Sequence, residues 1–283
     1  MMNSLVSTPW LADNLGAPDL KVLDASAHLP DAGRDAAAYF DRQHIPGARY
    51  MALKSLVDND SAVPTALPTS AQFAEHMASL GVSESDRVVL YDDSDIRSSA
   101  RGWFMCRMHG MQNVAVLDGG LGKWMAEGRE VESGQGDIQA TSFVASSSGG
   151  AVRSKADMFA NVASGAEQVV DARGAARFTG EVAEPRPGMA RGHIPRSRNL
   201  PFGQVMNADG TYKDEAGIRA AFAAAGVDVD RPLVATCGSG VTASVLLFAL
   251  HLIGADNCAA LYDGSWAEWG ADPSLPKETG DAA

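Results

Sequence analysis

Cys237 stands where a short apolar run gives way to a glycine-containing loop. The run Leu233–Thr236 predicts a buried strand, and Val241–Ile253, apolar on most faces, predicts the helix after the loop. Backbone N–H groups at a helix N-terminus point toward such a loop, and the helix dipole favours a thiolate there. Gly238 and Gly240 let backbone amides approach a ligand closely. The spacing therefore indicates a reactive thiolate in a loop that can hold an anionic group.

Two other interpretations of Cys237 start from the same residues. Free cysteines are often buried as small apolar side chains, so Cys237 alone could belong to a core. A cysteine phosphatase also holds an anion in such a loop, but it needs an arginine that binds the phosphoryl oxygens. Ala243 occupies that position here, and Thr236 stands where a histidine would precede the cysteine. These residue types argue against phosphate chemistry.

The elements that position this loop are predicted twice, in the same order. Strands are expected in the first half at 20–25, 87–91 and 114–117, with helices at 70–80 and 96–109. Strands are expected in the second half at 168–172, 233–236 and 259–261, with helices at 218–225 and 241–253. Marker residues pair at one constant separation: Gly81 with Gly226, Val89 with Val234, Asp118 with Asp263, Gly119 with Gly264 and Trp124 with Trp269. A period of this length indicates a duplicated domain.

Alternating strands and helices predict an α/β fold of two tandem domains, each a parallel sheet with helices on both faces. We expect domains at 1–134 and 154–283, joined by a linker at 135–153 whose most flexible point is 146–150. The first half has Asp92 at the repeat position of the cysteine, where it predicts a turn or helix-capping residue. The first domain is therefore expected to be catalytically inactive and the second to carry the chemistry.

Composition and charge limit the functions that the chain can have. Its 283 residues are 46% hydrophobic and carry a net charge of −12, which argues against nucleic acid or an anionic membrane as a partner. No secretory signal and no run of about 18 apolar residues is present, so a cytoplasmic protein is expected. The three cysteines form no CxxC pair, and Cys106 and Cys258 are expected in the core.

Short motifs at the repeat positions carry a resemblance to a known family. HIPGA occurs at 44–48 and GHIP at 192–195, while DGG occurs at 118–120 and DGS at 263–265, each before a tryptophan. With a cysteine loop in the second half only, the chain resembles the rhodanese-like sulfurtransferases over nearly its whole length. The loop CGSGVTA is similar to the branch that uses 3-mercaptopyruvate, since the thiosulfate-preferring branch has charged residues after the cysteine, as in CRKGVTA.

The resemblance implies a sulfurtransferase that moves sulfur from 3-mercaptopyruvate, through a persulfide on Cys237, to a thiol or cyanide, and releases pyruvate. The implied cradle around the sulfur consists of Gly238, Ser239, Gly240, Val241 and Thr242. A relay of Ser239, His44 and Asp35 is implied to move the proton. Thioredoxin or a small thiol is the implied acceptor, and neither a cofactor nor a metal is implied.

Two arginines, Arg177 and Arg186, are implied to bind the substrate. A planar guanidinium can bind a carboxylate and the neighbouring keto oxygen in fork geometry, which a lysine does less well. Arg186 lies in a segment that the first half lacks, which supports a special role. Both arginines could instead be surface residues of a charged loop.

Several alternatives stay open on the sequence alone. His44 and His193 occupy equivalent positions in the two halves, which is typical of a structural histidine that hydrogen-bonds a turn. A thiosulfate:cyanide sulfurtransferase would use the same scaffold, and a persulfide carrier would pass sulfur to a partner protein. The uncharged pair Gly238 and Ser239 favours a donor that arginines anchor elsewhere, because dianionic thiosulfate would favour cationic charge in the loop itself.

Overall fold

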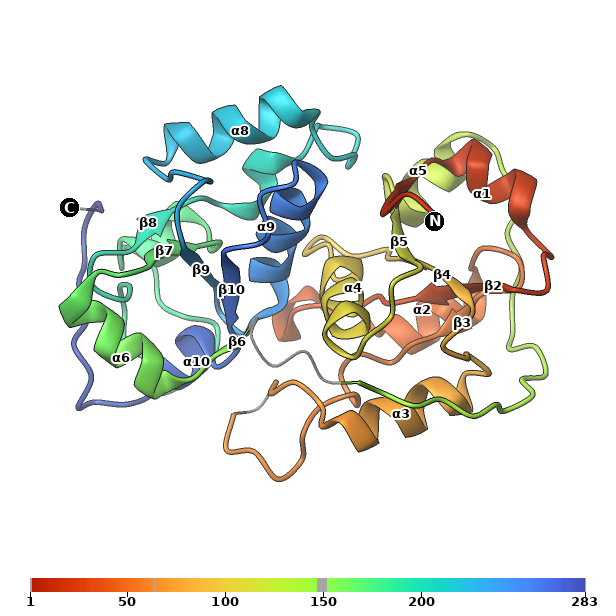
Figure 1. Ribbon diagram of the computed structural model, residues 1–283, viewed down its shortest axis with the longest axis horizontal. Coiled ribbons are helices and arrows are strands. Elements are labelled where there is room, and N and C mark those ends of the chain that lie inside the picture. The colour runs from red at the N-terminus through yellow and green to blue at the C-terminus, as the bar shows by residue number, and fades with distance from the viewer. Residues whose placement is uncertain (1, 64, 147–151, 283) are drawn as a thin grey trace. The chain divides into compact units, whose positions relative to one another are not determined.

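The computed structural model describes residues 2–63, 65–146 and 152–282, and it divides into two compact units (Figure 1). Unit 1 comprises Met1–Asn59, Leu67–Ser148 and Ala208–Tyr212, and unit 2 comprises Asp60–Ala66, Gly149–Asn207 and Lys213–Ala283. The boundaries expected at 134 and 153 stay predictions. Part of the expected linker is attached to unit 1, since the Thr141 hydroxyl donates to the Val82 carbonyl at 2.7 Å. Residues 147–150 of the expected flexible point lie outside the described residues.

Each unit contains one five-stranded sheet in which the recorded strand pairs are all parallel. The order across the first sheet is β1 (Leu5–Val6), β5 (Val114–Leu117), β4 (Arg87–Tyr91), β2 (Leu20–Asp24) and β3 (Arg49–Tyr50). The order across the second is β6 (Val152–Arg153), β10 (Ala259–Tyr262), β9 (Leu233–Thr236), β7 (Gln168–Asp171) and β8 (Arg198–Asn199). The two orders are the same, so the predicted duplication and α/β class are confirmed. The two-residue strands escaped prediction because they are too short to show a period.

Helices cover both faces of each sheet. Unit 1 has α1 (Thr8–Asn14), η1 (Pro30–Ala32), α2 (Ala36–Arg42), α3 (Ser70–Ser79), α4 (Ser99–Met108) and α5 (Gly120–Ala126). Unit 2 has α6 (Lys155–Ser164), α7 (Ala175–Phe178), η3 (Phe202–Val205), α8 (Glu215–Ala224), α9 (Val241–Leu252) and α10 (Ser265–Trp269). Helix α4 begins at Ser99 rather than at Ile96 as predicted, because Arg97 has a φ of +51° that no right-handed helix includes. In the described ranges, no helix combines the length and apolar character that crossing a bilayer needs.

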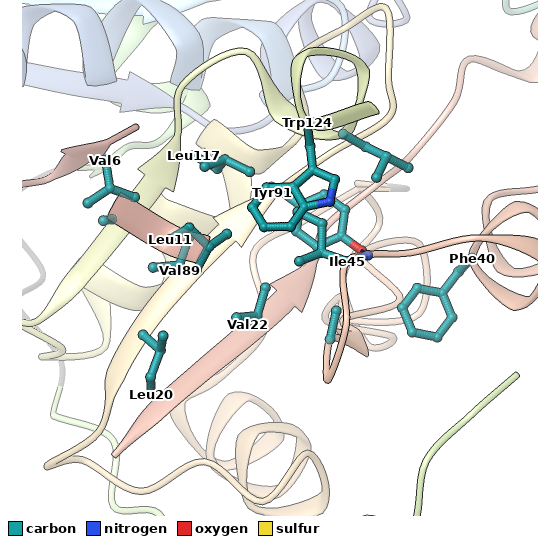
Figure 2. Packing of buried hydrophobic residues seen from close by; sticks show 13 residues of the cluster. Val6, Leu11, Leu20, Val22, Phe40, Ile45, Val89, Tyr91, Leu117 and Trp124 are labelled. Atoms are coloured by element: carbon teal, nitrogen blue, oxygen red, sulfur yellow. Dashed lines mark hydrogen bonds between the residues drawn. The ribbon is translucent and has the colours of Figure 1, made fainter. Parts of the chain in front are cut away.

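Apolar side chains of the strands fill the space between sheet and helices. In unit 1, Val22 and Val89 pack with Leu11 of α1, Phe40 of α2 and Trp124 of α5 (Figure 2). A second cluster in unit 2 joins residues of the sheet to α6 and α10: Met158, Val169, Ile194, Val234, Ala260, Tyr262, Trp266 and Trp269. Because α4 and α9 cover the opposite faces, the central strands β4 and β9 are buried on both sides, which explains their continuous apolar runs.

Candidate active site

The strand β9 delivers Cys237 to the carboxyl edge of the sheet of unit 2. The Cys237 side chain is 2% exposed, and the loop behind it turns at Gly240, whose φ of 76° favours glycine. Helix α9 starts directly afterwards, so its N-terminus faces the loop. The Ser239 N–H lies 3.5 Å from the Cys237 Sγ. The predicted strand, loop and helix around the thiol are therefore confirmed.

The carbonyl groups of this loop are turned away from the thiol by α10. The N–H groups of Trp266 and Ala267 donate to the carbonyls of Cys237 and Gly238, both at 2.9 Å. The Thr65 hydroxyl, which belongs to the same unit, donates to the Ser239 carbonyl at 3.2 Å. With its carbonyls held by other partners, the loop can present N–H groups to a ligand.

Several N–H groups of the loop have no acceptor among the residues that the structure describes. Within the described residues, the N–H groups of Gly238, Val241 and Thr242 donate no hydrogen bond. They belong to the loop and to the first turn of α9, where the positive end of the helix dipole lies. A cluster of such donors beside a sulfur atom is suited to an anion, because each fixed N–H dipole stabilises negative charge without reorganising.

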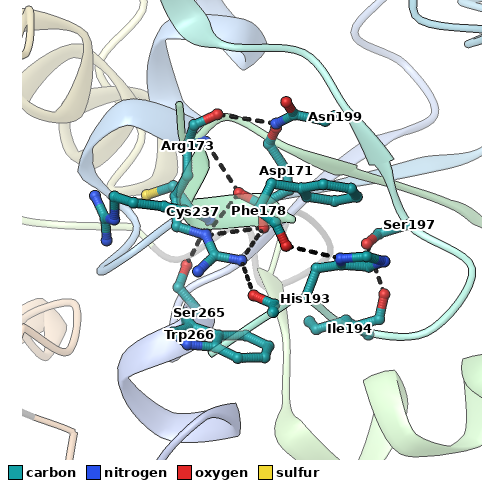
Figure 3. A network of polar contacts seen from close by, with 12 residues as sticks. Asp171, Arg173, Phe178, His193, Ile194, Ser197, Asn199, Cys237, Ser265 and Trp266 are labelled. Carbon is teal, nitrogen blue, oxygen red and sulfur yellow. Dashed lines mark hydrogen bonds and ion pairs between the residues drawn. The ribbon is translucent and has the colours of Figure 1, made fainter. Parts of the chain in front are cut away.

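The Ser265 hydroxyl joins the two ends of the loop. Its Oγ accepts the N–H of Cys237 at 3.2 Å (Figure 3). It also accepts the N–H of Gly240 at 3.1 Å and donates to the Tyr262 carbonyl at 2.8 Å. The sequence analysis did not select this residue. The signal was the change from DGG to DGS between the halves, since Ser265 occupies the repeat position of Gly120.

The guanidinium of Arg177 lies next to the cysteine loop. A Cβ atom added to Gly238 would be 2.9 Å from the Arg177 Nη2, so only glycine leaves room for this approach. Arg177 belongs to the short helix α7, which follows β7 and its carboxyl end. Arg186 is half-exposed and makes no hydrogen bond or ion pair to a described residue. Unit 2 thus brings Arg177 to the loop, while Arg186 remains a free cation of the same unit.

A buried network of charges supports Arg177. Arg173 is fixed by Asp171, to which its Nη2 donates at 2.7 Å, and by the Gly192 carbonyl at 2.8 Å (Figure 3). Its Nη1 donates to Glu184 at 2.7 Å, and the Glu184 carboxylate also binds Arg177. Although burial opposes it, contact with Asp171 and Glu184 raises the pKa of Arg173. This network is not predictable from the sequence, because it joins residues that show no periodic pattern.

Unit 1 fills the corresponding place with its own carboxylate. Asp92 follows β4 as Cys237 follows β9, and its two oxygens accept the N–H groups of Ser94 at 3.0 Å and Ser99 at 2.9 Å. Burial raises the pKa of Asp92, while these hydrogen bonds oppose that change. The predicted role of Asp92 as a turn residue is confirmed. Its side chain thus binds N–H groups of its own loop and of the first turn of α4.

The paired aspartates at the ends of β2 and β7 also differ between the units. Asp171 has Arg173 as a buried partner, whereas Ser26 follows Asp24 at the same spacing. Ser26 provides no positive charge to Asp24. Burial raises the pKa of Asp24 to about 6, although the hydrogen bonds from Ser26 lower it. A buried arginine two residues after this aspartate is therefore found only in the unit that holds the cysteine, where it is Arg173.

His44 and His193 make the same contacts in their separate units. The His44 Nδ1 lies 2.7 Å from the Phe40 carbonyl oxygen, and the His193 Nδ1 lies 2.8 Å from that of Phe178. The His44 ring stacks on the Phe40 ring with centroids 4.1 Å apart, and the His193 ring stacks on the Phe178 ring with centroids 3.7 Å apart. The His44 Nε2 is 3.2 Å from a Glu132 carboxylate oxygen. Both rings are buried, as expected of structural histidines, but their Nδ1 partners are carbonyls of α2 and α7 rather than of the predicted turns. The relay role of His44 stays a prediction.

Asp35 caps the helix that precedes His44. Its carboxylate accepts the N–H groups of Ala37 at 3.0 Å and Ala38 at 3.3 Å, as an N-cap residue of α2. Asp35 and His44 both belong to unit 1, and Ser239 belongs to unit 2. The relay role of Asp35 therefore also stays a prediction, beside a capping role that is observed.

The two other cysteines differ in their surroundings. Cys106 is buried within α4, as expected, and burial raises the pKa of its thiol to about 12. Cys258 is exposed, so its expected place in the core was wrong. It lies in the turn before β10 begins at Ala259, where side chains do not face the core.

Comparison with known proteins agrees with this architecture. The family described as rhodanese-like domain matches residues 7–127 and 154–272. The chain belongs to the rhodanese-like family. It is 40% identical over 275 residues to the 3-mercaptopyruvate sulfurtransferase of Mus musculus, covering 95% of this chain and 92% of the relative. The crystal structure of SseA from Escherichia coli, a 3-mercaptopyruvate sulfotransferase, matches this rhodanese-like chain with a TM-score of 0.85 and 34% identity, over 94% of this chain and 99% of that one.

Overall identity does not decide which donor this family member uses. The thiosulfate sulfurtransferase of Bos taurus is 37% identical over 276 residues, covering 95% of this chain and 92% of the relative. A donor preference must therefore be argued from the residues around Cys237.

Proposed function

We propose that this chain is a 3-mercaptopyruvate sulfurtransferase that carries sulfur as a persulfide on Cys237. The observation that carries the proposal is the open set of loop N–H groups around Cys237 with the Arg177 guanidinium beside Gly238. An α-keto acid needs a cation for its carboxylate and donors for the transferred sulfur, and unit 2 contains both. The loop itself has no lysine or arginine after the cysteine, which favours a monocarboxylate over dianionic thiosulfate.

The proposed transfer is a displacement at sulfur. The Cys237 thiolate attacks the donor sulfur, an S–S bond forms, and the C–S bond breaks with its electron pair going to the methylene carbon as the pyruvate enolate. The proton of the donor thiol returns to that carbon, so pyruvate leaves and an anionic persulfide remains. An acceptor thiolate then attacks the outer sulfur, becomes a persulfide itself and regenerates the Cys237 thiolate.

The remaining site residues are proposed in supporting roles. The N–H groups of Gly238, Val241 and Thr242 would bind the outer persulfide sulfur, and Ser239 would carry the proton to the enolate. Gly240, whose N–H donates to Ser265, would shape the cradle through the turn that it makes. Arg177 and Arg186 would bind the donor carboxylate and keto oxygen.

Three further parts of the proposal concern the relay, the acceptor and the compartment. His44 and Asp35 are proposed to orient Ser239, in addition to their observed contacts within unit 1. The proposed acceptor is thioredoxin or a small thiol, with cyanide as a substitute in the assay. A reducing compartment such as the cytoplasm fits a cycle that needs Cys237 as a free thiolate.

Mass spectrometry of Cys237 after incubation with 3-mercaptopyruvate tests the proposal directly. We expect one added sulfur atom on the peptide containing Cys237, and none in the Cys237→Ser variant, which should also release no pyruvate. Cys258→Ser is the matched control, because it removes an exposed thiol that the mechanism does not use. Pyruvate release that persists in Cys237→Ser would show that the proposed mechanism is wrong.

The alternative donor is tested by measuring both reactions on one preparation. The resemblance to the bovine thiosulfate sulfurtransferase favours this comparison. We expect a higher kcat/KM for 3-mercaptopyruvate than for thiosulfate, and a preference for thiosulfate of about tenfold or more contradicts the proposed donor. A persulfide carrier would instead form the Cys237 persulfide only from a partner protein and show no turnover with either small donor.

A further inference from the structure

We infer that Glu184 is a positioning residue that aims Arg177 at the cysteine loop and thereby sets the affinity for the donor carboxylate. The inference rests on the proposed function, which gives Arg177 its substrate. Glu184 itself touches no donor in this scheme. It acts by fixing the one flexible cation that lies beside Gly238.

The Glu184 carboxylate binds one edge of the Arg177 guanidinium. Its Oε1 accepts from Nε at 3.2 Å, and its Oε2 accepts from Nη2, so both oxygens are engaged side by side. Such a two-point contact fixes the plane of the guanidinium as well as its position. The Glu184 side chain is 5% exposed and that of Arg177 is 25% exposed, so the carboxylate is enclosed while the arginine keeps one open side.

Glu184 can serve as an anchor because it is itself held. Its Oε1 accepts from Arg173 Nη1 at 2.7 Å, and Arg173 is bound to Asp171 at the end of β7. The guanidinium of Arg173 also lies over the Trp266 ring, 4.6 Å from its centre. A chain of buried contacts therefore joins the sheet to Arg177.

The edge of Arg177 that Glu184 leaves open faces the loop. Within the described residues, Nη1 of Arg177 has no hydrogen-bond acceptor, and Nη2 is the atom that approaches Gly238. The two terminal nitrogens form the second fork of a guanidinium and can bind a carboxylate in the same two-point way. One fork therefore holds the arginine in place, and the other remains for the substrate.

A competing role for Glu184 makes the opposite prediction. A carboxylate on Arg177 also neutralises it, and in that case Glu184 would weaken the attraction of an anionic donor. Glu184→Gln removes the charge and keeps the size, whereas Glu184→Asp keeps the charge and shortens the reach. Positioning predicts weaker binding in both variants. Neutralisation alone predicts tighter binding in Glu184→Gln and no change in Glu184→Asp.

The experiment measures binding and turnover separately. Binding is read from the protection that pyruvate gives Cys237 against iodoacetamide, followed on the Cys237 peptide by mass spectrometry, and turnover from steady-state release of pyruvate from 3-mercaptopyruvate. We expect the protection constant and the KM to rise about tenfold in both variants, the scale of one lost charge-assisted contact, with kcat changed about threefold or less. Glu181→Gln, an exposed carboxylate of the same segment, is the control and should match the wild type.

A double variant separates positioning from general damage to the fold. In an Arg177→Ala background, Glu184→Asp should raise the KM less than about twofold, because the residue through which it acts is gone. An unchanged protection constant in Glu184→Asp overturns the inference, as does a full additional rise in the Arg177→Ala background. If pyruvate protects the wild type but no persulfide forms from 3-mercaptopyruvate, the proposed function fails while the role of Glu184 in binding a keto acid is still decided.

Discussion

One hydroxyl distinguishes the reactive loop of unit 2 from its counterpart in unit 1. Ser265 and Gly120 share a repeat position and a positive φ, 49° and 58°. A Cβ at Gly120 would lie 2.4 Å from the Asp92 carbonyl oxygen, so unit 1 has no room for a side chain there. Unit 2 tolerates a serine in this strained conformation because its hydroxyl accepts two loop N–H groups.

Replacing Ser265 tests whether that hydroxyl shapes the cradle. Ser265→Ala keeps the backbone strain and leaves the N–H groups of Cys237 and Gly240 without their acceptor, at about 1–3 kcal/mol for each buried donor. We expect lower stability in urea unfolding and a kcat/KM reduced about tenfold or more. Ser265→Gly relieves the strain, so it should be more stable than the alanine variant but equally slow.

The control for this comparison is Ser274→Ala, which removes an exposed hydroxyl bonded only to Asp272. It should match the wild type in rate. An alanine variant at Ser265 with wild-type kcat/KM would show that the loop keeps its shape without the hydroxyl.

At the scale of elements, the sequence predicted the duplicated domain and the alternation of strands and helices. The parallel sheets, the helices on both faces and the Cys237 loop follow from apolar runs, glycines and the separation of the two halves, whereas the strand order came only from the structure. The start of α4 at Ser99 was not predictable from those signals, because side-chain hydrogen bonds of Asp92 set it. Glu184 and Ser265 escaped because their contacts follow no periodic pattern: Glu184 binds arginines 7 and 11 residues away, and Ser265 binds the N–H of Cys237, 28 residues away.

The segments around His44 and His193 can be compared directly, because each histidine makes the same contacts within its own unit. His44 and His193 each stack on a phenylalanine and hydrogen-bond the carbonyl of that residue, so a histidine-to-glutamine change should destabilise each segment to a similar extent. The proposed relay adds a second effect for His44 alone. We expect His44→Gln to lower kcat about tenfold or more, and His193→Gln to leave kcat within about twofold, at equal stability loss.

The pair of variants is measured by urea unfolding and by the pH profile of kcat. A change in the profile for His44→Gln but not for His193→Gln supports a role in proton transfer. Equal kcat values and equal profiles for both variants would leave His44 as a structural residue and remove the relay from the proposal.

At the scale of the whole molecule, the two sheets have the same strand order but carry different side chains at the same strand end. In unit 1 the Asp92 side chain accepts the N–H groups of Ser94 and Ser99. In unit 2 the Cys237 thiol stands there, and within the described residues the N–H groups of Gly238, Val241 and Thr242 donate no hydrogen bond. The net charge of −12 disfavours anionic ligands at long range, so local donors and Arg177 must supply the attraction. The chemistry is therefore proposed for unit 2, where the thiol and Arg177 lie together.

Moving the cysteine to unit 1 tests how far turnover depends on groups other than the thiol. In the double variant Asp92→Cys with Cys237→Ser, we expect no persulfide at position 92 and no measurable release of pyruvate. Unit 1 has Gly120 in place of the Ser265 hydroxyl, and Ser26 in place of the arginine that supports the guanidinium in unit 2. A thiol without those groups has neither the Ser265 contacts that fix the loop nor a guanidinium held in place by a buried charge network. Asp92→Cys alone, with the native thiol present, should retain turnover and shows that the changed unit still folds. Turnover by the double variant within about tenfold of the wild type would mean that the strand–helix turn and a thiol suffice, and that the surrounding network is dispensable.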